Sequence, residues 1–260
     1  MPHSLRCLLA AVLGLCTAGI SVQAADTPWK PRKAVEIVIG AQAGGANDRV
    51  GRVLQKILAD TNAVPVPTMV MNKPGQGQSL SVAYVNTHPA DPHYLVVLGS
   101  SWVTTAITTG SNSTHRDLTP IIKAFDGDLV MFVAGGHVSA GISSSGSAQA
   151  MSSLGKVRMI GTISNQRLPL LPDLPTLREQ GYDVVASTWF TVFGPRGITP
   201  AQAAYWEDVF SKAMRHPEAK KFAETNNWTI DLIGSKELPA QLDKEYARLR
   251  KALTELGMVQ

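Results

Sequence analysis

The chain has 260 residues, 44% of them hydrophobic and 17% charged, and its formal net charge is +4. This apolar content is enough to build a core in one large domain or in two smaller ones. Lys and Arg form no run dense enough to indicate nucleic-acid binding, so no nucleic-acid partner is expected. The mild positive charge would instead give weak assistance to the binding of a small anion.

The first 24 residues have the features of a cleavable secretory signal peptide. Arg6 supplies the positive charge, residues 8–20 form an apolar stretch too short to span a bilayer, and Val22-Gln23-Ala24 suits cleavage. Residues 1–24 are therefore predicted to be removed, and the mature protein is expected outside the cytoplasm. A membrane anchor is the alternative interpretation of the apolar stretch.

Both cysteines, Cys7 and Cys16, lie inside this predicted signal. A lipoprotein site at Cys16 is disfavoured because the bulky Leu15 precedes it. The mature protein would then contain no disulfide, no thiolate nucleophile and no cysteine metal site. The six histidines are scattered without metal-ligand spacing. No metal and no cofactor is therefore expected.

The first element of the mature chain is predicted to be a strand, a glycine loop and a helix. Residues 35–39 are a short apolar, β-branched run, which favours a buried strand. From Asp48 the apolar residues recur at helical spacing, at Val50, Val53, Leu54, Ile57 and Leu58. Such a turn directs backbone N–H groups and the positive end of a helix dipole toward an anion. The predicted ligand-binding residues here are Gly44, Gly45, Ala46, Asn47 and Asp48.

Two simpler interpretations of this loop stay open. Gly44 and Gly45 could serve only to let the chain turn tightly, and Asp48 is expected to favour the helix N-terminus rather than to touch a carboxylate, which it would repel. The loop is neither a dinucleotide fingerprint nor a phosphate-binding P-loop, because the required glycines and the Gly-Lys-Ser/Thr are missing. If an anion binds, a β-branched side chain at Gly45 would fill its space, with added strain if φ is positive there.

Two further strands end in small polar residues. A strand over residues 68–71 leads through Gly75, Gln76 and Gly77 into a helix over residues 79–86, and an apolar strand over residues 94–98 ends at Ser100 and Ser101. In an open parallel sheet these strand ends lie at one edge, where ligands bind. These five residues join the predicted binding site.

The remaining chain is predicted as strands followed by helices. Strands are expected at 129–133 and 155–162, residues 188–193 are apolar and aromatic, and helices are expected at 176–180, 200–214, 217–226 and 238–256. Thr199 followed by Pro200 predicts an N-cap and a first-turn proline, and Gly181 is expected to end the short helix at 176–180. Residues 135–153 are rich in Gly, Ser and Ala.

A serine cluster in this Gly/Ser-rich segment raises a second function. Gly141-Ile142-Ser143-Ser144-Ser145-Gly146 is not Gly-x-Ser-x-Gly, because a serine occupies the position of the second glycine. His137 is near in sequence, but without an orienting acid the pair does not indicate a triad. We expect Ser143 and Ser144 to face a ligand cleft and no residue to be catalytic, so that the protein is not an enzyme. Trp189 is expected to be a core or hinge aromatic, with ligand stacking as the alternative.

Taken together, the motifs resemble those of the periplasmic solute receptors of tripartite tricarboxylate transporters, the Bug or TctC-like family. The matching segments follow one another in the family's order and cover most of the mature chain: Ala43-Gly44-Gly45-Ala46-Asn47-Asp48-Arg49 with Arg52; Asn72-Lys73-Pro74-Gly75; Tyr94 to Leu98; Gly155-Lys156-Val157-Arg158; Leu171-Pro172-Asp173-Leu174-Pro175-Thr176 with Glu179 and Gly181; Trp189; Phe193-Gly194-Pro195; and Thr199-Pro200.

This resemblance implies an α/β fold of the type II periplasmic-binding-protein kind, with two lobes around a cleft. Lobe 1 would comprise residues 25–121 plus 190–260, and lobe 2 residues 122–189. The implied function is that of a monomeric periplasmic receptor that captures a small carboxylate for the membrane subunits of the transporter. In this family the carboxylate is held largely by main-chain groups and waters between glycine loops.

The chain departs from the family pattern in two places. Gln78 stands where the second glycine loop usually has a small residue, and the chain is short in the middle, between the strand ending near Val133 and the segment beginning at Gly135. The second lobe is therefore expected to be reduced. A degenerate relative that binds no ligand stays open as an alternative, and so, less favoured, does a secreted serine hydrolase.

Overall fold

The structure, a computed structural model, describes residues 29–111, 113–135 and 138–259. The predicted signal peptide and His137 lie outside the described residues. The strands are β1 (Val35–Ile39), β2 (Thr68–Asn72), β3 (Tyr94–Gly99), β4 (Leu118–Ala134), β5 (Val138–Ser144), β6 (Val157–Thr162), β7 (Ser187–Pro195) and β8 (Trp228–Gly234). The helices are α1 (Ala46–Asp60), α2 (Ser79–Asn86), α3 (Ser101–Thr108), α4 (Ser145–Ser153), α5 (Pro200–Met214), α6 (Pro217–Thr225) and α7 (Leu238–Glu255), with 3₁₀ turns η1 (Gln76–Gln78) and η2 (His115–Asp117).

The larger sheet has the strand order β2-β1-β3-β7-β4, with β8 paired on the outer edge of β4. The first three strands are parallel, and β7, β4 and β8 join antiparallel. Because β1, β2 and β3 are parallel, their carboxyl ends lie at the same edge of the sheet. The three loops predicted to bind a ligand therefore lie at one edge.

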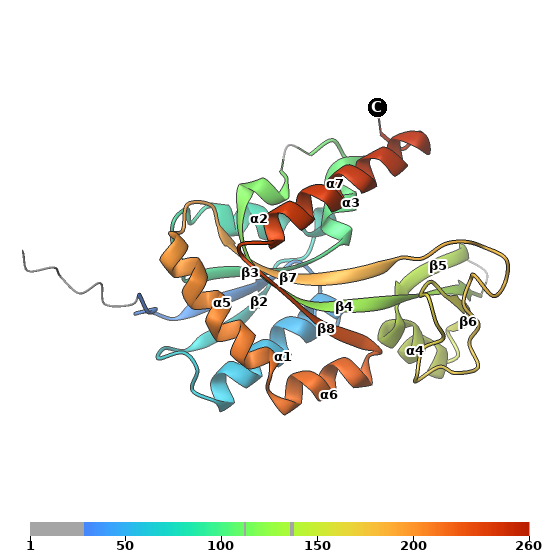
Figure 1. The fold of residues 1–260 in the computed structure, drawn as a ribbon, viewed down its shortest axis with the longest axis horizontal. Coiled ribbons are helices and arrows are strands. Elements are labelled where there is room, and N and C mark those ends of the chain that lie inside the picture. The colour runs from blue at the N-terminus through green and yellow to red at the C-terminus, as the bar shows by residue number, and fades with distance from the viewer. Residues whose placement is uncertain (1–28, 112, 136–137, 260) are drawn as a thin grey trace, which may run out of the picture.

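Helices cover both faces of this sheet (Figure 1). On one face Ile37 and Ile39 pack with Leu54 of α1 and Trp206 of α5. On the other face Val38 packs in a separate core with residues of α2, α3 and α7. Successive side chains of a strand point to opposite faces, so β1, which is apolar at every position except Glu36, is stable only when both faces are covered.

The strand β4 joins the larger sheet to a smaller one. Its first part, as far as Asp128, pairs with β7 and β8, and its last part, from Leu129, pairs with β5 and β6. In Figure 1 the smaller unit, with α4 against its short sheet, extends from the end of β4. We call the larger sheet with its helices the larger unit, and β5, β6, α4, the end of β4 and residues 163–186 the smaller unit. This mixed α/β arrangement agrees with the predicted fold class.

The smaller unit has only a small core. Val130, Ala148 and Leu168 are its buried apolar cluster, with Phe132 and Met159 among the partly buried residues against it. The proposed lobe boundary at residue 121 falls within β4, whose residues 122–127 still pair with β8 in the larger sheet. The exact division into lobes stays a prediction.

Several local predictions were wrong. No helix forms at 176–180, where the chain makes turns and the Gly181 φ of +91° closes a turn instead. No element was predicted for the segment 227–234, which contains β8, or for the segment 135–153, which contains β5 and α4. The first helix begins at Ala46 rather than Asp48. Among the described residues, no helix has the length and apolar character needed to cross a membrane.

Candidate functional site

The first loop places an uncapped helix end at the edge of the larger sheet. Gly44 has φ of +83°, and Gly45 is the N-cap of α1 in an extended conformation, with φ −67° and ψ 168°. Gly45 has no side chain that could cap the first turn of α1, and no other side chain among the described residues is seen to do so. The N-terminal N–H groups of a helix carry partial positive charge and attract anions when no cap accepts from them. Because φ at Gly45 is negative, the predicted left-handed strain does not apply there; it belongs to Gly44.

Asp48 holds this loop in place. Its Oδ2 accepts from the Gly44 N–H and from Arg52 Nε, both at 2.9 Å, and its Oδ1 accepts from Asn72 Nδ2 at 2.8 Å. Burial alone would favour the neutral acid, but the hydrogen bonds from Arg52, Gly44 and Asn72 outweigh it and hold the pKa of Asp48 below its ordinary value. The carboxylate is therefore engaged within the protein; it lies in the first turn of α1, as expected, but it holds the preceding loop rather than capping the helix.

The second loop is bent by four consecutive residues with positive φ. The φ values are 130° at Gly75, 45° at Gln76, 55° at Gly77 and 81° at Gln78. For residues other than glycine this left-handed region costs roughly 1–2 kcal/mol per residue. Gln76 remains exposed, whereas Gln78 turns inward and is 7% exposed.

Gln78 joins all three loops. Its Oε1 accepts from Asn47 Nδ2 of the first loop and from the Gly99 N–H at the end of β3, the latter at 3.1 Å. Its Nε2 donates to Ser101 Oγ at 2.7 Å. The three strand ends therefore meet, as predicted, and the Gln78 side chain contacts all of them directly.

A cavity of about 370 Å³ opens between these loops. Five of the predicted site residues line it, together with Gln78: Ala46, Asn47, Gly75, Gly77 and Ser101. Five others lie near it without lining it: Gly44, Gly45, Asp48, Gln76 and Ser100. Ser100 instead places its Oγ 2.9 Å from Thr188 Oγ1 at the start of β7. The role of all ten predicted residues as ligand contacts stays a prediction.

The two serines predicted on the smaller unit lie outside this cavity. Ser143 is paired with Val130 in the β4–β5 ladder, and Ser144, the N-cap of α4, donates from its Oγ to Ser147 Oγ at 3.0 Å. Ser145 is fully buried, and its Oγ donates to the Asn226 carbonyl of the larger unit at 2.7 Å. In this arrangement the backbone of Ser143 and the hydroxyls of Ser144 and Ser145 all have partners within the protein.

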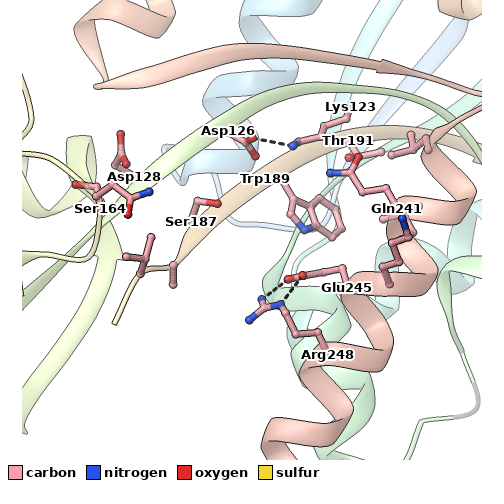
Figure 2. A pocket seen from close by; sticks show the side chains of 16 residues that line it. Lys123, Asp126, Asp128, Ser164, Ser187, Trp189, Thr191, Gln241, Glu245 and Arg248 are labelled. Carbon is pink, nitrogen blue, oxygen red and sulfur yellow. Dashed lines mark hydrogen bonds and ion pairs between the residues drawn. The ribbon is translucent and has the colours of Figure 1, made fainter. Parts of the chain in front are cut away.

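A second cavity, of about 480 Å³, lies where the two units join (Figure 2). It is bordered by β4 and β7, by α7, and by the segments around Ser164 and Val185. Trp189 lines it while remaining 8% exposed and belongs to one apolar core of the larger sheet, as expected of a core aromatic; we call this cavity the hinge cavity because it lies where the units join. The hydroxyl of Thr191 and the Oε1 of Gln241 are buried there without a hydrogen-bond partner among the described residues.

Charged side chains in this hinge cavity are mostly paired (Figure 2). Lys123 is 5% exposed and donates to Asp126 at 2.7 Å and to Asp231 at 2.6 Å. Burial raises the pKa of Asp126 to about 6; Asp231 adds to the rise and Lys123 opposes it. This cluster was not predicted from the sequence, because the strand in this region was expected only at residues 129–133. A lone lysine inside the apolar run Ile121-Ile122-Lys123-Ala124-Phe125 was the available signal.

Within the described part of the chain, no three His, Cys, Asp or Glu side chains gather as metal ligands. The hydroxyls of Ser144 and Ser145 bond to a serine and to a carbonyl rather than to a histidine. At the glycine loops, the Asn47, Gln78 and Ser101 side chains that line the cavity are groups able to hydrogen-bond to a small polar molecule.

Comparisons with known proteins agree with this geometry. The sequence model of the tripartite tricarboxylate transporter family receptors, TctC, matches residues 125–258. A UPF0065 protein from the gbd 5′ region of Cupriavidus necator is 25% identical over 317 residues, with 95% of this chain and 94% of the relative covered. That aligned stretch is longer than this 260-residue chain, so the relative contains residues for which this chain has no counterpart.

Solved structures share the fold. The periplasmic binding protein BugD matches with a TM-score of 0.79 at 15% identity, covering 88% of this chain and 99% of BugD. MatC from Rhodopseudomonas palustris with bound malate matches with a TM-score of 0.74 at 17% identity, covering 85% of this chain and 99% of MatC. The family match extends over half of the sequence, and the chain belongs to the tripartite tricarboxylate transporter receptor family, TctC.

Proposed function

We propose that this protein is a periplasmic receptor that captures a small carboxylate and presents it to the membrane subunits of a tripartite tricarboxylate transporter. The ligand class is a di- or tricarboxylate or an acidic amino acid, and the protein acts as a monomer without chemical change to the ligand. The observation that carries the proposal is the meeting of three strand-end loops around one cavity beside the uncapped N-terminus of α1. The malate held by MatC, a protein of similar fold, supports the same class.

The electrostatics of the loop cavity favour an anion. No acidic side chain is among its lining residues, and the nearby Asp48 is directed toward Gly44, Arg52 and Asn72. The cavity therefore combines donors with the positive end of a helix and lacks a repelling carboxylate. A ligand held in this way would also be reached by Ser143 and Ser144 if the smaller unit closes on it, which keeps these two serines in the proposal.

The direct test is a thermal-shift panel of malate, succinate, adipate, citrate, aspartate and glutamate on the mature protein, followed by calorimetric titration. A ligand at 100 times its Kd stabilises the folded state by about 2.7 kcal/mol, which gives a saturable rise in Tm. Succinamide, the neutral counterpart of succinate, serves as the matched control ligand. Equal shifts with succinate and succinamide would count against carboxylate recognition, and mass spectrometry of co-purified small acids identifies the natural ligand.

A receptor that has lost its ligand is the alternative that one observation favours, because Gln78 occupies donors of the loop cavity. A flat thermal panel with a folded protein would support it. The serine hydrolase alternative is tested by an esterase assay beside the panel. We expect the wild type to show no more esterase turnover than a Ser144→Ala, Ser145→Ala double variant. Wild-type turnover that the double variant lacks would overturn the receptor proposal.

A further inference from the structure

The side chain of Gln78 stands where the three loops would otherwise leave donors for a ligand. Its Oε1 receives the Asn47 Nδ2 donor and the Gly99 main-chain N–H, which come from the loops after two different strands. Gly40 leaves room for it, since a Cβ at Gly40 would lie 2.7 Å from the Gln78 Cβ. The side chain is therefore fitted into the cavity wall rather than lying on its surface.

The backbone at this position does not require glutamine. Gln78 has φ of 81°, a conformation that glycine adopts freely and that side chains other than Asn and Asp rarely adopt. A strained residue persists when its surroundings hold it there. Gln78 is held by Asn47, Gly99 and Ser101. The contacts of its side chain, and not the geometry of the turn, therefore account for a glutamine at this position.

A carboxamide and a carboxylate have the same planar shape, and a carboxylate oxygen accepts from two N–H donors in the same way as the Gln78 Oε1. We propose that the Gln78 carboxamide occupies one carboxylate subsite of the loop cavity from within the chain and thereby determines which ligands the receptor accepts. This inference rests on the proposed function of the cavity. The wild-type protein then offers a ligand the remaining hydrogens of Gln78 Nε2 and Asn47 Nδ2, the side chains of Gln42, Ser101 and Thr105, and the neighbouring main chain.

The first test is Gln78→Gly, which removes the carboxamide and keeps the left-handed backbone without strain. The Asn47 Nδ2 and Gly99 N–H donors become available, so we expect succinate or malate to bind at least about tenfold tighter than to the wild type, which corresponds to about 1.4 kcal/mol. Asn62→Gly is the matched control, because Asn62 also has a positive φ, 48°, and lies on an exposed turn after α1. Its affinity should equal that of the wild type.

The second test, Gln78→Glu, places a covalently held carboxylate against the same donors. We expect added succinate to lose affinity at least tenfold relative to Gln78→Gly, and we expect the introduced carboxyl to titrate below the ordinary glutamate value of about 4.3. Nuclear magnetic resonance of the labelled side chain measures that titration. A value above 4.3 would show that the donors do not serve an anion and would overturn the inference.

The outcomes separate this inference from the proposed function. If the wild type binds a carboxylate and folded Gln78→Gly binds it no more tightly, the inference is overturned and the receptor proposal stands. If only Gln78→Gly binds, the inference is supported and the wild type is not a receptor for the acids tested. If neither folded protein binds, the donors freed by the substitution are not a carboxylate subsite, and the inference fails.

Discussion

The carboxylate of Asp48 accepts a hydrogen bond from the backbone N–H of Gly44 at 2.9 Å, so a residue inside α1 fixes the loop that precedes the helix. Asp48 is 2% exposed and also accepts from Arg52 and Asn72. Hydrogen bonds to charged groups contribute roughly 1.5–3 kcal/mol each in net stability. We expect Asp48→Ala to destabilise the fold by about 2–3 kcal/mol in urea unfolding, since the partners regain water only in part.

The matched control is Asp60→Ala, near the end of the same helix, where the carboxylate is exposed and pairs only with Lys56. Its cost should stay within about 0.5 kcal/mol. The Asp48 contribution also depends on pH. Its folded pKa lies below the unfolded one, so the stabilisation is present above about pH 4 and is lost as pH falls through the folded pKa. If the difference in unfolding free energy between the wild type and Asp48→Asn does not narrow from pH 5 to pH 2, this prediction is contradicted.

Two adjacent glycines of the first loop should respond differently to the same substitution. At Gly44 φ is +83° and an added Cβ would meet nothing within 4 Å, so Gly44→Ala tests the backbone conformation alone. We expect it to cost roughly 1–2 kcal/mol. Gly45 has φ of −67°, so Gly45→Ala carries no left-handed strain; its Cβ would lie 3.2 Å from the Gln42 carbonyl oxygen, and we expect a smaller cost of about 0.5 kcal/mol. Equal costs in chemical denaturation would mean that the loop conformation differs from the one described.

The local parts of this fold were predictable from sequence, and the parts set by distant contacts were not. The N-cap of α5 at Thr199 and the apolar periodicity from Val50 to Leu58 depend on neighbours within a few residues. Both predictions are confirmed. The length of β4 is a tertiary effect. Lys123, Asp126 and Asp128 interrupt the apolar pattern, but pairing with β7 and β8 on both sides keeps the segment extended.

In the candidate site, too, the local features were predictable and those set by distant contacts were not. The glycine loops were predictable because strand, glycine and helix signals are adjacent in sequence. The inward position of Gln78 was not, since it depends on a left-handed backbone and on partners 31 and 21 residues away, Asn47 and Gly99. In β8, Trp228 was not recognised as the start of a strand, because the strand is stabilised by distant contacts: its pairing with β4 and the packing of Trp228 on Phe125 and Phe190.

Asp126 in the hinge cavity should make the stability of the protein fall as pH rises. Its folded pKa of about 6 lies above the unfolded value of about 3.9, so the folded state holds the proton more tightly. The stabilisation is complete below about pH 4 and is lost as pH rises through about 6. Relative to the wild type, Asp126→Asn should therefore gain roughly 1–2 kcal/mol between pH 4 and pH 7, discounted for its partial exposure.

This change is measured as the difference between the two urea-unfolding free energies at each pH. Asp173→Asn is the control, since Asp173 lies exposed in a loop of the smaller unit. Its pH curve should run parallel to that of the wild type. A parallel curve for Asp126→Asn as well would place the pH sensitivity elsewhere.

The smaller unit should open more often than the larger one. Its buried apolar cluster consists of Val130, Ala148 and Leu168, whereas each face of the larger sheet has an extensive core. Burial of apolar surface must offset the ordering entropy of every residue, at about 25 cal/mol per Å² against 1–2 kcal/mol per residue. Amide hydrogen exchange should therefore be faster in β5, β6 and α4 than in β1 and β3.

Leu168→Ala sharpens this prediction, because Leu168 is 3% exposed and belongs only to the small cluster. Truncating a buried leucine costs about 2–5 kcal/mol. If the smaller unit opens independently, exchange should accelerate in β5, β6 and α4 while protection in β1 and β3 is unchanged. The matched control, Leu98→Ala in the larger unit, should accelerate exchange throughout. Uniform acceleration by Leu168→Ala would instead show that links such as Ser145 to Asn226 make the two units unfold as one.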